Sequence, residues 1–408
     1  MRVLSFNTRE TGGAARAAWR LHSGLQQAGA DAQFVVKSKT SQAADVIEVP
    51  FHETRSGLRH AIGRRLDWRH RRRYFDQQRT STFYSECVTR YRPEHFAGLP
   101  QANVYQLHWL ATFVDWQSTL PWMLEQAPVV WTQHDMNALF GIWHYAPSSE
   151  EVTPDLAYLE HQSRLLKEAL FSSLPADRLV FVSPSNWLAE LIRKEPMLAR
   201  FRTEVIPNSV EIDVFQPLDK KLARQALGLE ETDRVVGFAS ESLEDERKGA
   251  ALLGAALDQL PAGDFVSLSV GSGIFPVSGS RKHMSLGSLQ SDRLLALFYA
   301  ALDVFVIPSL QDNLPNTVLE AMACGTPVVG FDIGGIPDMV RPGQTGWLAP
   351  AKDVSALAAC IKEALESPRN TQQLGLECRR VVEAEYTATC QSQRYLELYE
   401  SLLGGDPV

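Results

Sequence analysis

Residues 312–325 read Asp-Asn-Leu-Pro-Asn-Thr-Val-Leu-Glu-Ala-Met-Ala-Cys-Gly and decide how the surrounding chain folds. The segment Val304–Ile307 before them is short and rich in β-branched residues, which predicts a buried parallel strand. Pro315 suits the first helical position, where its missing N–H needs no partner, and Gly325 suits the end of a helix. The stretch therefore predicts a strand, a loop and a helix in that order.

The start of this predicted helix is a candidate phosphate site. Free backbone N–H groups are expected at Asn316, Thr317 and Val318, and the helix dipole also favours an anion there. Glu320 lies one turn further along, where its carboxylate can accept hydrogen bonds from a ribose diol. Asp312 precedes the helix, so we expect the two acids to flank a bound nucleotide sugar. The substrate-binding residues expected from the loop itself are Asn313, Leu314 and Pro315.

The order of residues in this stretch resembles a known family signature. An acid, seven residues and then Glu-Ala-Met-Ala-Cys-Gly-Thr-Pro-Val-Val is similar to the motif of the retaining nucleotide-sugar glycosyltransferases of the large bacterial family 4. The resemblance implies the GT-B fold, an α/β class with two Rossmann-like domains of doubly wound parallel sheet that face a cleft. Most members carry glutamate at the first acidic position, where this chain has Asp312.

Size and composition agree with two ordinary globular domains. The chain has 408 residues, of which 45% are hydrophobic and 22% charged, and this is too long for one compact core. The net charge of −8 argues against a nucleic-acid-binding protein. Five scattered cysteines without a Cys-x-x-Cys pair indicate neither disulfides nor a zinc site. The N-terminus enters a strand without a signal region, so we expect the chain to stay in the cytoplasm.

Strands and helices are expected to alternate throughout, which predicts parallel sheets covered on both faces. The strands expected are Val3–Phe6, Ala32–Val36, Val46–Val49, Val104–Leu107, Val129–Thr132, Leu179–Val182 and Thr203–Ile206, and then Val235–Ala239, Val266–Val270, Val304–Ile307 and Val328–Phe331. The helices expected are Ala14–Ala28, Tyr158–Leu174, Asn186–Lys194, Ala250–Gln259, Asp292–Leu302, Val354–Glu366 and Thr389–Leu403. Together with the resemblance, this gives an acceptor-side domain at 1–206, a donor domain at 207–388 and a helix at 389–408 that returns to the first domain.

In the first half, the candidate site residues lie where predicted strands end. Gly12 and Gly13 follow the first strand and allow a ligand to approach the backbone closely. A tight turn is the favoured explanation from the residues alone, whereas the resemblance favours a binding loop. His108 and His134 follow two later strands, on the rim where ligands bind in such sheets. A structural histidine is an alternative for each. His134 resembles the histidine of the family's Thr-x-His-Asp motif, which implies a catalytic role at the transferred sugar.

In the second half, Arg247 and Lys248 precede a predicted helix, where positive charge is unfavourable unless an external anion binds. A solvated charged loop is the alternative. The resemblance implies that Lys248 grips the donor diphosphate, that Asp312 contacts the reacting sugar, and that the turn at Leu289 holds the base. These cations and the helix N–H groups would stabilise the leaving diphosphate, so no metal or other cofactor is expected.

The resulting hypothesis is a metal-independent glycosyltransferase that moves a sugar, with retention of configuration, from a nucleotide-diphosphate donor to a glycan or lipid-linked acceptor, in cell-surface polysaccharide synthesis. A nucleotide-sugar epimerase of the same fold and a non-catalytic nucleotide-sugar-binding protein are the alternatives.

The segment Arg55–Arg79 has nine arginines and two aspartates in a chain that is acidic overall. Its apolar residues fall near one side of a helix, which is typical of a segment that lies on an anionic membrane surface. A solvated insertion is the alternative. We therefore expect either a peripheral position on the inner face of the membrane or capture of an anionic acceptor.

Overall fold

The computed structural model describes residues 1–52, 80, 82–261, 263, 265–277 and 282–404. The arginine-rich segment Arg55–Arg79 lies outside the described residues. The chain divides into two compact units. Unit 1 comprises Met1–Pro184, Leu188–Ile206 and Ser392–Val408, and unit 2 comprises Ser185–Trp187 and Pro207–Gln391.

Unit 1 is built on a seven-stranded sheet whose strands are all parallel. In spatial order the strands are β3 (Val46–Glu48), β2 (Asp31–Ser38), β1 (Arg2–Arg9), β4 (Val104–Leu107), β5 (Val129–Thr132), β6 (Leu179–Ser183) and β7 (Arg202–Val205). The helices of this half are α1 (Gly13–Gln27), α3 (Pro93–Phe96), α4 (Trp116–Gln126), α5 (Pro154–Ser173) and α6 (Asn186–Lys194). The strand order reverses between β1 and β4, and in such sheets ligands bind at the carboxyl ends of the strands beside this point.

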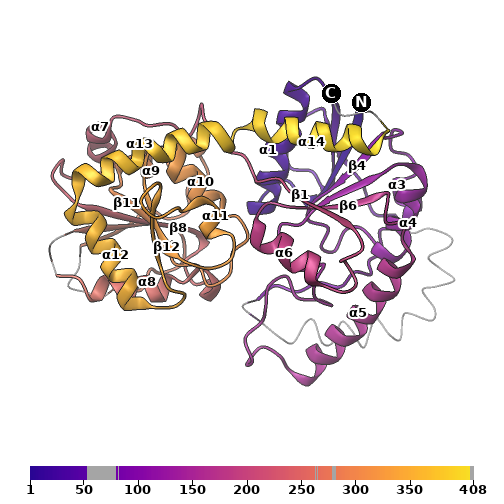
Figure 1. Cartoon of the computed structure of the whole chain (residues 1–408), viewed down its shortest axis with the longest axis horizontal. Coiled ribbons are helices and arrows are strands. Elements are labelled where there is room, and N and C mark those ends of the chain that lie inside the picture. The colour runs from indigo at the N-terminus through magenta and orange to yellow at the C-terminus, as the bar shows by residue number, and fades with distance from the viewer. Residues whose placement is uncertain (53–79, 81, 262, 264, 278–281, 405–408) are drawn as a thin grey trace. The chain divides into compact units, whose positions relative to one another are not determined.

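Unit 2 repeats the design with six parallel strands. In spatial order they are β10 (His283–Ser285), β9 (Val266–Ser272), β8 (Val235–Ser242), β11 (Val304–Ile307), β12 (Val328–Phe331) and β13 (Gly346–Ala349). The helical elements are α7 (Lys220–Ala226), the 3₁₀ turn η1 (Glu246–Lys248), α8 (Ala250–Asp258), α9 (Asp292–Ala301), α10 (Asn316–Ala323), α11 (Ile336–Met339), α12 (Val354–Glu366) and α13 (Pro368–Glu385). Helices α8 and α12 cover one face of the sheet, and α9, α10 and α13 cover the other (Figure 1). The reversal of strand order lies between β8 and β11.

Helix α14 (Ala388–Leu402) contributes two buried tyrosines to unit 1. The Tyr399 hydroxyl donates to Oε1 of Gln106 at 2.8 Å, and the Tyr395 hydroxyl shares a hydrogen bond with the Thr132 hydroxyl at 2.7 Å. Gln106 also donates to Thr132 at 2.9 Å. Gln106 and Thr132, in the middle of the sheet, thus have hydrogen-bond partners on a helix from the far end of the sequence.

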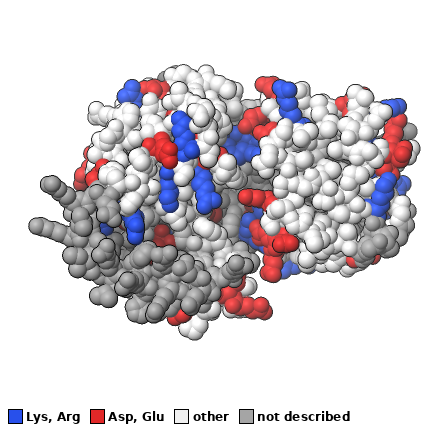
Figure 2. Space-filling model, turned by 180° about the vertical axis from the view of Figure 1, so that it is seen from behind, with Lys and Arg blue, Asp and Glu red and all other residues white. Residues whose placement is uncertain are grey.

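The described residues bear on several predictions about the chain as a whole. The two Rossmann-like parallel sheets are confirmed. All five cysteines carry free thiols. In the described part of the chain, no helix is both long enough and apolar enough to cross a bilayer. Figure 2 shows acidic and basic side chains interspersed on the face of the molecule that it presents.

Candidate functional site

Lys248 and Asp312 form an ion pair beside the reversal point of unit 2. Lys248 ends η1, which follows β8, and Asp312 lies in the loop that follows β11. The Lys248 Nζ lies 2.6 Å from the Asp312 Oδ2, and the Arg247 Nη1 lies 3.9 Å from the same oxygen. The predicted cation pair of Arg247 and Lys248 and the separately predicted Asp312 are therefore brought together by the fold.

The Asp312 carboxylate is buried, with 6% of the residue exposed. Burial raises the pKa of this carboxyl, but the charges of Lys248 and Arg247 lower it by more, so the net pKa lies below its ordinary value. A hydrogen bond from the Ser309 hydroxyl, at 3.3 Å, acts in the same direction. Asp312 is consequently ionised at neutral pH. The Lys248 side chain is 22% exposed, which leaves its ammonium group accessible to an incoming anion.

Two glycines allow the loops around this ion pair to approach each other. Gly249 has a φ of 73°, and a Cβ there would lie 1.9 Å from the carbonyl oxygen of Pro308. Gly334 has a φ of 59°, and a Cβ there would lie 2.1 Å from the carbonyl oxygen of Asp312. A side chain at either position would displace the loop that carries Asp312. The sequence analysis missed Gly334, although the Gly-Gly pair after a predicted strand was a signal for it.

The start of α10 differs from the prediction by one residue. Pro315 is the N-cap, with an extended ψ of 119°, and Asn316 is the first helical residue. The carbonyl of Pro315 therefore accepts the first hydrogen bond, from the Val318 N–H at 3.1 Å. The prediction of a free N–H at Val318 was wrong, because the Val318 N–H already has this partner. The candidate phosphate donors at the helix start are now Asn316 and Thr317.

Glu320 lies within α10 with only 1% of its surface exposed. Its Oε2 accepts a hydrogen bond at 3.1 Å from the hydroxyl of Tyr299, a residue of α9 that the sequence analysis did not single out. The other loop residues predicted for the site are also close to the core. Asn313 and Leu314 are buried, and Leu289 packs against the apolar cluster of unit 2.

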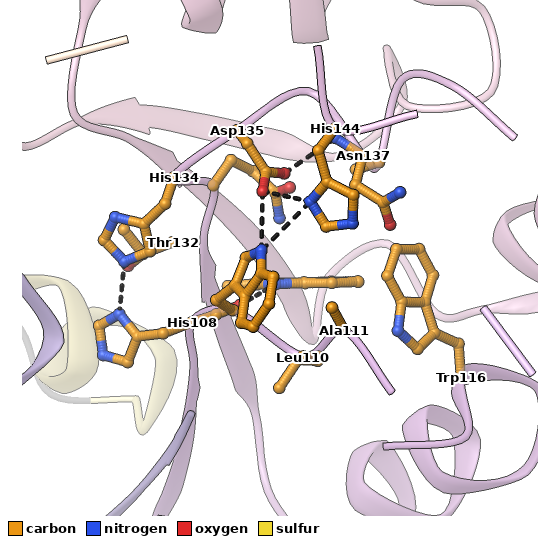
Figure 3. Close-up of a pocket in the computed structure, with 13 residues that line it drawn as sticks. His108, Leu110, Ala111, Trp116, Thr132, His134, Asp135, Asn137 and His144 are labelled. Carbon is orange, nitrogen blue, oxygen red and sulfur yellow. Dashed lines mark hydrogen bonds and ion pairs between the residues drawn. The ribbon is translucent and has the colours of Figure 1, made fainter. Parts of the chain in front are cut away.

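In unit 1, the two predicted histidines lie side by side (Figure 3). His108 follows β4 and His134 follows β5, and these strands are neighbours. The His108 Nδ1 lies 3.0 Å from the His134 Nε2, and the rings stack with centroids 5.2 Å apart. Desolvation lowers the pKa of His134 to about 4, and burial lowers the pKa of His108 well below its ordinary value. Both rings are therefore neutral at pH 7, so one nitrogen of this pair donates and the other accepts.

Next to this pair, Asp135 is the centre of a second hydrogen-bond network (Figure 3). Its Oδ2 lies 2.5 Å from the His144 Nδ1 and accepts the Trp109 indole N–H at 2.9 Å. On its far side, the His144 Nε2 contacts the Ser85 hydroxyl at 2.8 Å. Burial raises the pKa of Asp135, but its contacts with His144, the Asn137 N–H and His134 together lower it below its ordinary value, so the carboxylate is ionised at neutral pH. The sequence analysis assigned no role to Asp135, Trp109 or Ser85.

Lys167 of α5 supports the loop that carries these residues. The side chain is fully buried, and its ammonium group donates to the carbonyls of Asn137 and Phe140 at 2.5 and 2.8 Å. It also lies 4.4 Å from the centroid of the Trp116 ring. Burial lowers the pKa of Lys167 to about 8, so it remains mostly protonated at pH 7. The loop after β5 is thus held from inside unit 1 by a buried cation.

The histidine pair and the Asp135 network line one pocket of unit 1. Its lining residues are His108, Trp109, Leu110, Ala111, Trp116, Trp131, Thr132, Gln133, His134, Asp135, Asn137, Ala138 and His144. Gly12 and Gly13 are not among them. Gly12 is the N-cap of α1 with a φ of 100°, and Gly13 begins the helix. Among the described residues, no group of three or more His, Cys, Asp or Glu side chains is placed to hold a metal ion.

Residues 233–367, which form most of unit 2, match the family model "Glycosyl transferases group 1". D-inositol 3-phosphate glycosyltransferase of Mycobacterium marinum is 29% identical over 283 residues, which cover 66% of this chain and 56% of that protein. The same enzyme of Mycobacterium tuberculosis strain F11 is 30% identical over 275 residues, covering 64% and 53%. The chain thus spans a little over half the length of these curated relatives.

Solved structures are similar over nearly the whole chain. Sucrose-phosphate synthase from Thermosynechococcus elongatus has a TM-score of 0.70 at 20% identity and covers 98% of both chains. HepE from Anabaena in complex with UDP-glucose has a TM-score of 0.64 at 17% identity and covers 98% of this chain and all of the other. At these identities the likeness shows the fold. The resemblance stated from residues 312–325 is confirmed at the level of group 1, whereas membership of family 4 and the retaining mechanism stay predictions.

Proposed function

Because residues 233–367 match the family model "Glycosyl transferases group 1", we propose that the chain transfers a sugar from a nucleotide-diphosphate donor to a hydroxyl of a glycan or a lipid-linked acceptor. The observation that carries this proposal is the ion pair of Lys248 and Asp312 at the carboxyl ends of β8 and β11. It places a partly exposed cation and a buried carboxylate at the reversal point of a parallel sheet, and the carboxylate lies in the loop that leads to α10.

Each group of unit 2 has a task in this proposal. Lys248 and Arg247, with the N–H groups of Asn316 and Thr317, would bind the diphosphate and stabilise the negative charge that it gains as it leaves. Glu320 would accept hydrogen bonds from the ribose, and Asp312 would orient hydroxyls of the sugar. The solved complex of HepE with UDP-glucose supports a donor of this class. In this account the leaving group is stabilised by protein cations, so the reaction needs no metal ion.

The pocket of unit 1 would serve the sugar and the acceptor hydroxyl. His134 is partly exposed there and neutral at pH 7, so it can accept or donate a hydrogen bond without carrying charge. Retention of configuration is part of the proposal. It would proceed by attack on the same face from which the diphosphate departs, with a diphosphate oxygen helping to take the acceptor proton.

A panel of nucleotide sugars tests the donor assignment. Binding to the folded state raises stability by RT ln(1 + [L]/Kd), so the correct donor should raise the melting temperature of the wild type. Glu320→Gln should abolish most of that rise. Glu366→Gln, in an exposed i,i+4 pair of α12, is the matched control and should keep it. If no nucleotide sugar stabilises the wild type, the proposal is wrong.

Turnover then separates the three hypotheses. A transferase releases the nucleoside diphosphate faster when an acceptor hydroxyl is supplied, and it forms a new glycoside. An epimerase would change the donor sugar without any acceptor. A binding protein would show the thermal shift with neither reaction.

The proposal extends to a role in cell-surface polysaccharide synthesis at the inner face of the membrane, supported by the nine arginines of the segment Arg55–Arg79. Wild-type protein should bind vesicles that contain anionic lipid, and added salt should weaken this binding. Changing Arg69, Arg71, Arg72 and Arg73 to Ser should abolish vesicle binding and leave donor affinity unaltered. A wild type that ignores such vesicles would contradict this part of the proposal alone.

A further inference from the structure

Among the buried side-chain atoms of unit 1 that have no hydrogen-bond partner in the described residues are the Ser5 Oγ, the His22 Nδ1 and the His108 Nε2. The three residues are almost completely buried, with exposures of 0%, 0% and 3%. Buried polar atoms in folded proteins are paired with protein groups or with ordered water in the great majority of cases. Three such atoms in one region are therefore a candidate site for a buried water molecule.

The fold places the three residues on the same side of the sheet. Val3 and Val104 belong to one apolar cluster with Leu21 and Leu25 of α1, so they lie on the same face of the sheet, the face on which α1 packs against β1 and β2. Side chains alternate along a strand. Ser5 therefore points to the same face as Val3, and His108 continues the row of Val104 just beyond the end of β4.

His22 packs into the same layer. It lies on α1 next to Leu21, and its ring contacts the ring of Phe34 in β2, with centroids 5.4 Å apart. A positive charge on His22 would lower the pKa of His108, which places the two rings within electrostatic range of each other. β1 and β4 are hydrogen-bonded neighbours, so Ser5 on β1 and His108, just beyond the end of β4, share this face of the sheet.

His22 and His108 each form a hydrogen bond with a residue outside this group of three. The His22 Nε2 lies 2.7 Å from the Asp45 Oδ2, which also accepts from Gln26 at 2.9 Å. Burial raises the pKa of Asp45, but His22 and Gln26 lower it below its ordinary value, so it is a carboxylate at neutral pH. At the other end, the His108 Nδ1 contacts the His134 Nε2 in the pocket (Figure 3).

We propose that Ser5, His22 and His108 bind one water molecule, and that this water completes a hydrogen-bonded chain from Asp45 through His22 and His108 to His134. In this chain His22 is a positioning residue for His134. This hydrogen-bonded chain lies wholly within unit 1, and its existence does not depend on the proposed function. The catalytic consequence does rest on that function.

The carboxylate at one end fixes the direction of every link. A carboxylate only accepts, so the His22 Nε2 carries hydrogen and its Nδ1 is left to accept from the water. Hydrogen bonds in a chain polarise one another, which favours donation toward Asp45 throughout. The His108 Nε2–H then donates to the water, and the His134 Nε2–H donates to the His108 Nδ1. The His134 Nδ1 is left with a lone pair that can accept a hydrogen bond from a substrate hydroxyl.

Nitrogen NMR of the full-length protein with ¹⁵N-labelled histidine tests the chain directly, because it distinguishes a protonated ring nitrogen from one with a lone pair. Wild-type His134 should be a single tautomer with hydrogen on Nε2. His22→Phe keeps an aromatic ring against Phe34 and removes both nitrogens, so His134 should become a mixture of tautomers. Ser5→Val fills the water site while keeping His22, and it should have the same effect.

His95→Phe is the matched control. His95 is another buried histidine of unit 1, its ring stacks on Phe51 with centroids 5.5 Å apart, and its nitrogens contact Arg92 and His52. Its substitution should leave the His134 signals unchanged. Wild-type His134 with hydrogen on Nδ1 would overturn the proposal. So would an unchanged His134 in Ser5→Val, even if His22→Phe does not fold.

Sugar transfer gives a second readout. Loss of the fixed tautomer should lower kcat by about tenfold, within the range of general acid–base contributions, while KM for the donor stays within about twofold. A wild type that transfers no sugar would contradict the proposed function and would leave the NMR result intact.

Discussion

Replacing Lys248 by Met tests whether the ion pair with Asp312 is built into unit 2 before any ligand binds. The substitution keeps most of the side-chain volume and removes the charge. It leaves the Asp312 carboxylate buried, with Arg247 at 3.9 Å and the Ser309 hydroxyl at 3.3 Å as remaining contacts. We expect the loop after β11 and the following helix α10 to lose stability.

The expected magnitude follows from the contacts that remain. A hydrogen bond to a charged group contributes about 1.5–3 kcal/mol, and removing one partner of a fully buried pair costs about 3–5 kcal/mol. Lys248 is 22% exposed and Asp312 keeps two contacts. We therefore expect the free energy of opening α10 to fall by about 2 kcal/mol, close to the lower of these figures. Since 1.4 kcal/mol is a factor of ten, opening of α10 should be about 30-fold more frequent.

Amide hydrogen exchange read on peptides from α10 measures this opening locally, without requiring the whole chain to unfold in one step. Lys362→Met is the control, because Lys362 is 55% exposed and lies 3.7 Å from Glu366 in an i,i+4 pair. Such pairs contribute about 0.3–0.5 kcal/mol, so exchange there should rise less than about threefold. Equal effects of the two substitutions on α10 would refute the reasoning.

The pH dependence of the same experiment has a defined sign. The folded pKa of Asp312 is lowered from 3.8, so the stability that the ion pair supplies is present above that pH and is lost as the pH falls below it. The difference in the stability of α10 between the wild type and Lys248→Met should therefore persist near neutral pH and become smaller below pH 3.8.

Four further outcomes are expected. Glu320→Gln should weaken donor binding by about 10- to 100-fold in calorimetry, because the ribose loses a charged acceptor; an unchanged Kd would remove Glu320 from the site. Transfer should continue in EDTA, because Lys248 and Arg247 meet the charge of the leaving group; loss of activity that Mg²⁺ or Mn²⁺ restores would contradict this. NMR of the product should show the anomeric configuration of the donor, and inversion would rule out the retaining mechanism. Tyr395→Phe should destabilise unit 1 by about 1 kcal/mol in hydrogen exchange of β5, because Thr132 loses a buried partner; unchanged exchange would mean that the bond contributes nothing.

Much of the fold could be predicted because buried parallel strands have a strong local signature. Strands β4, β5, β11 and β12 and helices α6 and α12 have the predicted bounds. Helix α13, of 18 residues, was missed, and several other missed elements have weak or conflicting local signals. Helix α4 contains Pro121, which argues against a helix from sequence alone, and β10 and β13 are only three and four residues long.

Within the candidate site, the contacts between separate loops were not predicted. Lys248 and Asp312 are 64 positions apart, and spacing along the chain does not show that two loops meet. The contact between His108 and His134 could have been foreseen, because sequential parallel strands are often neighbours. The network around Asp135 could not, because Ser85 comes from an irregular segment without a periodic pattern.

Helix α14 has a consequence for how the protein is made. Gln106 and Tyr399 are separated by 293 positions, and Thr132 and Tyr395 by 263. On a ribosome, the first half of the chain emerges long before the two tyrosines that satisfy its central polar row. Domains generally form in order from the N-terminus during synthesis, yet here the sheet that is translated first is completed last. A nascent chain that has not reached α14 therefore has an incomplete first unit. Its Gln106 and Thr132 side chains still lack their tyrosine partners and can pair incorrectly or be bound by chaperones.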